Sequence, residues 1–307
     1  MTQNPMMPSH VQFLEQPGAL VAFDWSFSVP EEAGKSAAPR ALLLVNGFQR
    51  DRSDFRALRK RLHQKATFPL LTLSLDNRGC GQSKVQKTPL ETSDWVEDVL
   101  ALREWALQHL ETRLGPSLAG SAMVGLLGIS MGGMIAQAAS GRAPEAWQRL
   151  ILVSTTPGGE LRVWPSHIPS QPIPYKPFPK DFDSLKARMV QYFGPAFLES
   201  NPLIVDIMVK NMIKNSQEPS SRSWAQAQHD AAVGFDGTSY LTHHRAPTLV
   251  VTGDQDQIIP PGNSEALVKH IKGSQKKVYP NVGHLILVEE PERFSQDVLN
   301  FLNEWSL

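Results

Sequence analysis

The sequence predicts an α/β protein whose mostly parallel central sheet is flanked by helices. Three observations lead to this prediction. Short apolar runs without alternating polar residues recur along the chain, as expected of strands that are buried on both faces. Amphipathic helical patterns separate most of these runs, which is typical of parallel strands joined by crossover helices. The alternation stops near residue 156 and resumes near residue 246, so the sequence of strands contains a helical insertion.

Composition narrows the classes of function. The 307 residues include 30 lysines and arginines and 30 aspartates and glutamates, so no net charge favours nucleic acid or an anionic membrane. The first ten residues are polar and predict no signal peptide, and no apolar run has membrane-spanning length. The one cysteine, Cys80, excludes an internal disulfide. We expect a cytoplasmic protein that binds neither nucleic acid nor membrane; the sequence makes no prediction of oligomeric state.

The core is expected to comprise residues 1–156 and 246–307. Residues 11–14 and 20–29 alternate apolar and polar side chains around a Pro-Gly turn, which predicts an antiparallel hairpin. Ser53 and Ser93 are expected to cap the two helices that follow. The further strands are expected at 41–45, 70–75, 124–127, 150–153, 248–252 and 277–279, and the helices at 53–65, 93–114, 134–139, 264–270 and 291–305.

Residues 157–245 are expected to form a helical cap, or lid, inserted after the sixth strand. Helical patterns cover 182–192, 203–214 and 223–232, and no buried-strand pattern interrupts them. The proline-dense stretch 164–179 also contains aromatic residues. We interpret it as an ordered lid entrance, with a partner-binding polyproline segment as the alternative.

A sharp strand-to-helix turn at residues 128–132 carries the clearest chemical signal. The segment reads G-I-S-M-G, follows an apolar run and precedes a helix-forming run. So tight a turn leaves no room for side chains two residues before and after Ser130, hence the glycines. It would expose the Ser130 hydroxyl at a helix N-terminus, where N–H groups stabilise negative charge. The motif alone also fits a glycine-rich connection or a remnant phosphate loop, but no lysine follows at phosphate-loop spacing.

A serine nucleophile requires a base, and the base requires an orienting group. Of nine histidines, only His284 is expected in a loop just beyond a strand, at the sheet edge where catalytic groups collect. Asp256 is the preferred partner of His284 and Asp254 the alternative, because both follow another strand; either aspartate also suits a simple turn. The order along the chain is Ser130, Asp256, His284.

With these residues, the chain resembles the α/β-hydrolase fold superfamily from about residue 11 to residue 307. The matching motifs are D-x-R-G-x-G-x-S at 76–83, G-x-S-x-G at 128–132, G-x-x-D at 253–256 and G-H at 283–284. The resemblance implies a Ser-His-Asp triad, an acyl-enzyme, and no cofactor or metal. Esterases, enol-lactonases and cofactor-free perhydrolases have similar nucleophile turns.

The same resemblance implies an oxyanion hole formed by the backbone N–H groups of Phe48 and Met131. The family usually has His-Gly after its third strand, whereas this chain has Asn46 before Gly47, which leaves the hydrogen bonding behind Gly47 open. Asp76 and Arg78 are expected to hold their loop in shape and not to react. A serine at the turn, where those enzymes have aspartate, argues against dehalogenase or epoxide hydrolase chemistry.

The expected substrate is a small, neutral, apolar carboxylic ester or lactone. Trp164, Tyr192 and Trp224 are expected to contact it, because the cap carries more large apolar side chains than a short insertion buries. Cationic cap residues such as Arg162, Lys186 and Arg188 are expected on the solvated face, not at a substrate carboxylate. The alternatives are hydrolysis of a carbon–carbon bond in a diketone and a ligand receptor that retains a slow triad.

Overall fold

A computed structural model describes residues 11–31, 33, 37–86, 90–166, 175–215 and 224–304. These residues form a nine-stranded sheet of order β1-β2-β4-β3-β6-β7-β8-β9, with β5 paired to β2. Neighbours from β4 to β9 are parallel, whereas β2 pairs antiparallel with β1, β4 and β5. The mostly parallel sheet is therefore confirmed.

The strands follow the apolar runs closely. β3, β4, β7 and β8 are buried over their whole length, as continuous apolar runs predict. Among the strands of the described residues, only the two-residue β5 has no counterpart in the sequence prediction, because it is too short to show a pattern. The bounds are β1 Gln12–Gln16, β2 Ala19–Ser28, β3 Arg40–Val45, β4 Leu70–Leu75, β5 Lys84–Val85, β6 Met123–Ile129, β7 Arg149–Val153, β8 Thr248–Gly253 and β9 Gln275–Tyr279.

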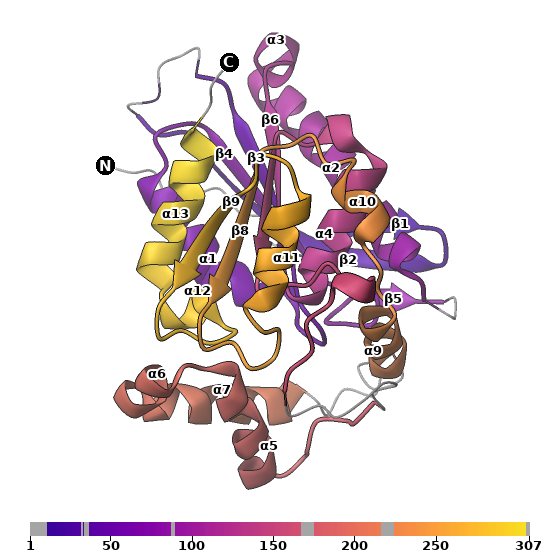
Figure 1. Cartoon of the computed structure of the whole chain (residues 1–307). Coiled ribbons are helices and arrows are strands. Elements are labelled where there is room, and N and C mark those ends of the chain that lie inside the picture. The colour runs from indigo at the N-terminus through magenta and orange to yellow at the C-terminus, as the bar shows by residue number, and fades with distance from the viewer. Residues whose placement is uncertain are drawn as a thin grey trace.

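Helices cover both faces of the sheet (Figure 1). Leu43 of β3 belongs to the hydrophobic cluster that includes residues of α2, α4 and α11, whereas Leu42 belongs to the cluster that includes residues of α1, α12 and α13. This alternation along one strand divides the core into two layers. The core helices are α1 Arg56–Lys65, α2 Thr92–Leu114, α3 Pro116–Ala119, α4 Met131–Arg142, α11 Gly262–His270, α12 Ile286–Glu289 and α13 Pro291–Asn303; residue 305 lies outside the described ranges.

The predicted caps Ser53 and Ser93 are wrong. Asp51 caps a 3-10 turn, η1 (Arg52–Phe55), that leads into α1, and its carboxylate accepts from both the N–H and the hydroxyl of Ser53. Glu91 caps α2 in a reciprocal capping box. In both cases a carboxylate two residues earlier takes the terminal donors, and the serine hydroxyl donates to that carboxylate.

Between β7 and β8, the described residues form helices and no named strand. This segment follows the seventh strand of the chain, or the sixth when β5 is not counted. Its described helices are η3 Gly159–Leu161, α5 Phe182–Met189, η4 Val190–Tyr192, α6 Pro195–Ser200, α7 Pro202–Asn215, α9 Ala225–Val233 and α10 Thr238–Leu241. Figure 1 shows α5, α6 and α7 grouped beyond one end of the sheet, with α9 separate from them. Residues 167–174, inside the expected lid entrance, and 216–223 lie outside the described ranges.

Helices α5 and α7 have a small hydrophobic core of their own. Its buried members are Leu185, Met189, Phe193, Val205 and Val209, and the half-buried Leu285 and Val288, which follow β9, pack against them. The insertion is thus seated on the segment that carries His284. Across the described ranges, no helix combines the length and the apolar character needed to cross a membrane.

Candidate active site

Ser130 lies at the junction of β6 and α4 in a strained backbone conformation. Its φ is 56° and its ψ is −120°, values that a residue with a side chain seldom adopts. A Cβ at Gly128 would overlap the carbonyl oxygen of Gly132, and a Cβ at Gly132 would overlap the carbonyl oxygen of Val45. Glycine is therefore required on both sides of Ser130, which confirms the steric interpretation of the motif.

Neighbouring strand ends hold this turn in place. The Ser130 N–H donates to the Val153 carbonyl oxygen over 2.9 Å, and the Thr155 hydroxyl donates to the Ser130 carbonyl oxygen over 2.7 Å. A Cβ at Gly47 would lie 3.2 Å from Ser130 Cβ and 3.7 Å from its Oγ. The loop that follows β3 therefore lies directly against the half-buried Ser130 side chain.

His284 and Asp256 form a buried pair. The imidazole Nδ1 lies 2.8 Å from Asp256 Oδ2, and the two residues are 3% and 4% exposed. Asp256 Oδ1 accepts the N–H groups of Ile258 and Ile259 over 2.9 and 2.8 Å. Because both carboxylate oxygens are occupied, Asp256 fixes the ring and favours a proton on Nδ1. Nε2 is then free to accept a proton.

Asp254, the alternative partner, has a different contact. Its Oδ1 accepts the N–H of Asn281 over 2.7 Å, and Asn281 has a φ of 62°. Asp254 therefore stabilises the tight turn that leads to His284, but it does not touch the imidazole. Of the two aspartates, the structure brings only Asp256 to His284.

The candidate residues are gathered at one edge of the sheet. Ser130 follows β6, Asp256 follows β8 and His284 follows β9, and the carboxyl ends of these parallel strands lie at the same edge. Among the hydrogen bonds of the described residues, none joins Ser130 Oγ to His284. Such contacts often tighten only when substrate binds.

Two backbone N–H groups near Ser130 are unengaged. Within the described part of the chain, neither Phe48 N–H nor Met131 N–H donates a hydrogen bond. The Asn46 side chain donates to the Asp51 carbonyl oxygen, and the Asn46 carbonyl oxygen accepts from Asn77 Nδ2 over 2.8 Å. Asn46 thus spans its own loop from residue 46 to residue 51 and joins that loop to Asn77.

Asp76 and Arg78 are structural, as expected. Asp76 Oδ1 and Oδ2 accept the N–H groups of Arg52 and Gln82, both over 2.8 Å, and Asp76 also pairs with the Arg52 guanidinium. Arg78 makes two hydrogen bonds of 2.8 and 2.7 Å to the carboxylate of Asp98 in α2. These contacts fix the loop after β4.

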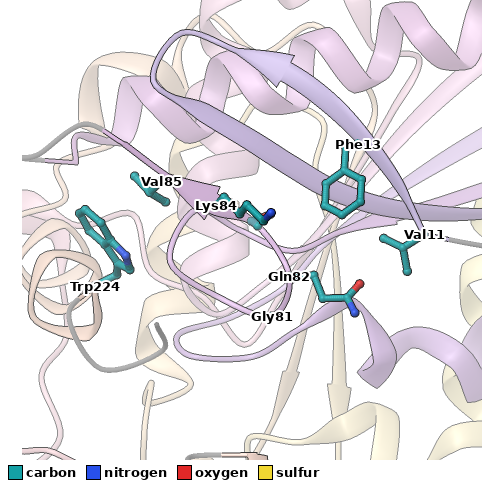
Figure 2. A pocket seen from close by; sticks show the side chains of 8 residues that line it. Val11, Phe13, Gly81, Gln82, Lys84, Val85 and Trp224 are labelled. Atoms are coloured by element: carbon teal, nitrogen blue, oxygen red, sulfur yellow. The ribbon is translucent and has the colours of Figure 1, made fainter. Parts of the chain in front are cut away.

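The three predicted substrate-contact residues have unlike surroundings. The Tyr192 ring meets the His284 ring edge-on, with centroids 5.7 Å apart, and the Tyr192 carbonyl oxygen accepts the His284 N–H over 2.8 Å. The Trp164 ring stacks on the Arg162 guanidinium. Trp224 lies against Gly79 and across a groove from Phe13 (Figure 2). Only Tyr192 contacts a residue of the candidate triad.

Aromatic rings around Phe48 were not predicted as part of the site. The rings of Tyr175, Phe178 and His229 each lie 6.4 Å from the Phe48 ring, measured between centroids. The sequence signal for Tyr175 and Phe178 was their place in the proline-dense stretch, which indicated a lid entrance. No signal singled out His229. These rings make the surroundings of Phe48 aromatic and mostly apolar.

The three cationic side chains that the sequence singled out in the insertion have partners among the described residues. Lys186 pairs with Asp206 over 2.6 Å, and Arg188 donates to two backbone carbonyl oxygens over 3.0 Å each. Arg162 donates to the carbonyl oxygens of Val233 and Ala232 at the end of α9, over 2.9 and 2.7 Å. The prediction that Arg162 lies on the solvated face is therefore wrong. The last carbonyl groups of α9 have no partner within the helix, and the Arg162 guanidinium donates hydrogen bonds to them.

The expected surplus of apolar cap residues is also smaller than predicted. Seven large apolar side chains of the insertion either are buried in its small core, as Met189 and Phe193 are, or pack half-buried against that core, as Leu285 and Val288 also do. These seven are Phe178, Phe182, Met189, Tyr192, Phe193, Met208 and Met212.

Glu289 joins the insertion to the His284 loop. Its Oε2 accepts the N–H of Gly194 over 2.8 Å, and its Oε1 accepts the N–H of Gly283 over 2.9 Å. Burial raises the pKa of the Glu289 carboxyl to about 7. The two hydrogen bonds lower this pKa, and the charges of Asp256 and Glu290 raise it further. Sequence reasoning missed this residue, since a glutamate at the end of a short helix has no distinctive pattern.

The raised pKa of Glu289 predicts how stability changes with pH. A carboxyl that holds its proton more tightly when folded stabilises the protein below about pH 4.5 and loses that contribution as pH rises to about 7. Wild type should therefore lose more free energy of unfolding between pH 4.5 and pH 8 than Glu289→Gln, which cannot titrate. Urea denaturation at both pH values measures this difference. Equal losses in the two proteins would contradict it.

The sequence matches a hydrolase family model and is similar to several known proteins. Residues 37–291 match the model of the family Hydrolase_4, described as serine aminopeptidase, S33. Polyketide synthase ThaQ of Burkholderia thailandensis is 30% identical over 211 residues, which are 65% of this chain but only 9% of that protein. Proline iminopeptidase PfmaB of Pestalotiopsis fici is 28% identical over 96% of this chain and 100% of its own. 3-Oxoadipate enol-lactonase 2 of Acinetobacter baylyi is 27% identical over 73% and 75%.

Solved structures show the same architecture at lower identity. The meta-cleavage product hydrolase of Pseudomonas fluorescens IP01 has a TM-score of 0.69 and 17% identity, over 92% of this chain and 95% of its own. The enol-lactonase of Burkholderia xenovorans LB400 has a TM-score of 0.67 and 19% identity, over 92% and 97%. The sheet, its two helical layers and the family match over most of the sequence lead to one conclusion: the chain has the α/β-hydrolase fold and belongs to the serine aminopeptidase S33 family of hydrolases.

Proposed function

We propose that this protein is a serine hydrolase whose triad is Ser130, His284 and Asp256. The observation that carries the proposal is the buried His284–Asp256 pair at the sheet edge where the strained Ser130 turn also lies. The unengaged N–H groups of Phe48 and Met131 support an oxyanion hole, because Gly47 brings the first of them close to Ser130.

The proposed reaction has two halves. His284 Nε2 takes the proton of the Ser130 hydroxyl as its oxygen attacks the substrate carbonyl, and the Phe48 and Met131 N–H groups hold the resulting oxyanion. His284 then gives that proton to the leaving oxygen, the carbon–oxygen bond breaks, and the acyl-enzyme remains. Water repeats the sequence and releases the acid. Throughout, Asp256 keeps the proton on Nδ1 and stabilises the imidazolium.

We infer that residues 157–245 form a cap over a core of residues 1–156 and 246–307. The support is the packing of α5 and α7 against Leu285 and Val288, next to His284. In this proposal Tyr192 contacts the substrate, since its ring already lies against His284. Trp164 and Trp224 remain predicted substrate contacts, although neither ring contacts a residue of the candidate triad in this structure.

The proposed substrate is a small, neutral, apolar carboxylic ester or lactone. Aromatic rings lie beside Phe48, and the cations Lys186 and Arg188 are engaged by groups of the protein, so an anionic substrate would have to displace those partners. Enol-lactonases among the relatives and structural neighbours support a lactone as the reacting group, though not the neutral charge.

The acyl site should favour apolar length. Over aryl esters of increasing acyl length, kcat/KM should rise several-fold per methylene until the site is filled, because each buried methylene contributes about 0.8 kcal/mol. Matched anionic hemiesters should be poorer substrates than the neutral esters. Steady-state kinetics on both series test this. If acetate is the best ester, or if hemiesters are preferred, the proposed substrate class is wrong.

The same assay separates the other activities. The family description and the proline iminopeptidase relative point to aminoacyl anilides as a competing class, and the carbon–carbon bond of a diketone is the alternative expected from the sequence. We expect the highest kcat/KM on the esters or lactones. A higher value on prolyl anilide or on a vinylogous diketone would assign the triad to that bond instead. Binding without turnover on every panel would identify a ligand receptor.

A further inference from the structure

Gln228 of α9 is a fully buried amide that connects the insertion to two core loops. Its side-chain Oε1 accepts the N–H of Gln49 over 3.1 Å. Its Nε2 donates to the Arg78 carbonyl oxygen over 2.8 Å and to Cys80 Sγ over 3.1 Å. The residue is 0% exposed, so these bonds are shielded from water. A single side chain therefore links the loop after β3 to the loop after β4.

The loop after β3 is a tight turn with a strained residue. The Arg50 N–H donates to the Gly47 carbonyl oxygen over 3.3 Å, which closes a turn with Phe48 and Gln49 at its centre. Gln49 has a φ of 55°, whereas Phe48 is not among the described residues of positive φ. This pattern is that of a type II turn, which normally has glycine at the third position. A glutamine there is strained and needs support from its surroundings.

Gln228 supplies that support. The central peptide of the turn joins Phe48 to Gln49, and its N–H is the group that Gln228 Oε1 accepts. Rotation of this peptide would convert the turn to type I and would relieve the left-handed Gln49. It would also break the hydrogen bond and leave a buried amide oxygen without a partner, which is unfavourable. The hydrogen bond thus opposes the rotation that backbone strain favours.

Helix α9 is well placed to act as an anchor. Arg162 caps its last carbonyl groups, and Trp224 at its start packs so closely on Gly79 that a Cβ there would overlap the tryptophan. In Figure 1 α9 is separate from α5, α6 and α7. Both ends of α9 are therefore held by the rest of the protein. Because Gln228 lies between them, its side chain holds the Gln49 N–H in a fixed position.

We propose that Gln228 is a positioning residue: by holding the Phe48–Gln49 peptide it keeps the whole turn in place against Ser130. The turn carries the Phe48 N–H, which belongs to the adjoining Gly47–Phe48 peptide and receives the oxyanion only while the turn stays in that place. This inference rests on the proposed function, in which Phe48 is an oxyanion donor. Gln228 touches no reacting atom. Its effect is expected on kcat and on the reaction of Ser130, and not on ground-state binding.

The first test replaces the amide with an apolar side chain of similar length. Gln228→Met should lower kcat, and the rate at which a fluorophosphonate labels Ser130, by about tenfold to a hundredfold, since loss of a whole oxyanion donor costs about a hundredfold or more. KM should change less than about threefold. Gln226→Met is the matched control, because Gln226 is an exposed glutamine of the same helix bonded only to Asp230. If Gln228→Met does not fold, Gln228→Asn replaces it, since its shorter amide cannot reach Gln49.

The second test asks whether backbone strain at Gln49 is the reason that Gln228→Met lowers kcat. Glycine adopts positive φ freely, so in a Gln49→Gly background the turn no longer needs Gln228. There, Gln228→Met should lower kcat by less than about threefold. An equal loss in both backgrounds, a loss confined to KM, or a loss matched by Gln226→Met would overturn the proposal.

A separate readout distinguishes this inference from the proposed function. The Gln49 amide hydrogen should exchange slowly in wild type and at least about tenfold faster in Gln228→Met, whatever the enzyme hydrolyses. If wild-type Ser130 is not labelled, the proposed function fails, and exchange alone then decides whether Gln228 holds the turn. If labelling occurs but exchange and rate are unchanged in Gln228→Met, only the inference about Gln228 fails.

Discussion

Ser130→Ala should lower turnover of the best ester by about a millionfold, to the residual rate that binding and the oxyanion hole alone sustain. The loss is this large because the residues of a triad act together. Without Ser130 Oγ, His284 has no proton to take and no acyl-enzyme forms. Alanine at the turn retains the same Cβ, so the strained backbone and its hydrogen bonds to Val153 and Thr155 should persist.

The measurement is kcat on the purified variant, with circular dichroism to verify folding. Ser121→Ala is the matched control, because Ser121 is an exposed serine near α3 whose hydroxyl bonds only a local carbonyl oxygen. It should retain wild-type kcat. Turnover in folded Ser130→Ala within tenfold of wild type would show that another group is the nucleophile.

Asp256→Asn should lower turnover by about four orders of magnitude while the fold is preserved. The geometry gives the reason. Asp256 Oδ1 accepts the N–H groups of Ile258 and Ile259, so the asparagine carbonyl oxygen must take that side. Its amide NH₂ then faces His284 Nδ1 and forces the proton of the imidazole onto Nε2. In that tautomer His284 cannot accept the Ser130 proton.

Asp254→Asn is the control for this substitution. The carbonyl oxygen of asparagine can still accept the Asn281 N–H, so the turn before His284 is retained. Turnover should stay within about threefold of wild type. Kinetics of the two variants on one ester decide the matter: a larger loss in Asp254→Asn than in Asp256→Asn would mean that Asp254 is the orienting carboxylate.

The parallel sheet and the Ser130 turn were predictable because their causes are local. Strands such as β3 and β8 are buried on both faces, so their consecutive residues are mostly apolar and the pattern can be recognised in the sequence. The glycines at 128 and 132 are fixed by overlap with backbone atoms a few residues away or on the next strand. Chain order then placed Asp256 and His284 at the edge where Ser130 lies.

The contacts that the sequence did not predict join residues far apart in the chain. Gln228 meets Gln49 across 179 positions, Gly194 meets Glu289 across 95, and Arg162 caps a helix end 70 positions later. An isolated glutamine, glutamate or arginine carries no periodicity that marks such a partner. The helix caps failed for a local reason, because a carboxylate at residue 51 or 91 competed with the predicted serine.

The most direct test of the account is to identify the residue that a fluorophosphonate modifies. The wild-type protein is treated with the reagent, digested, and its modified peptide sequenced by mass spectrometry, with Ser130→Ala treated in parallel. We expect a single adduct on Ser130, formed at a rate that falls when Asp256→Asn is introduced, and no adduct in Ser130→Ala. An adduct on a different serine, or an unmodified Ser130 in a protein that hydrolyses esters, would contradict the assignment of Ser130 as the nucleophile.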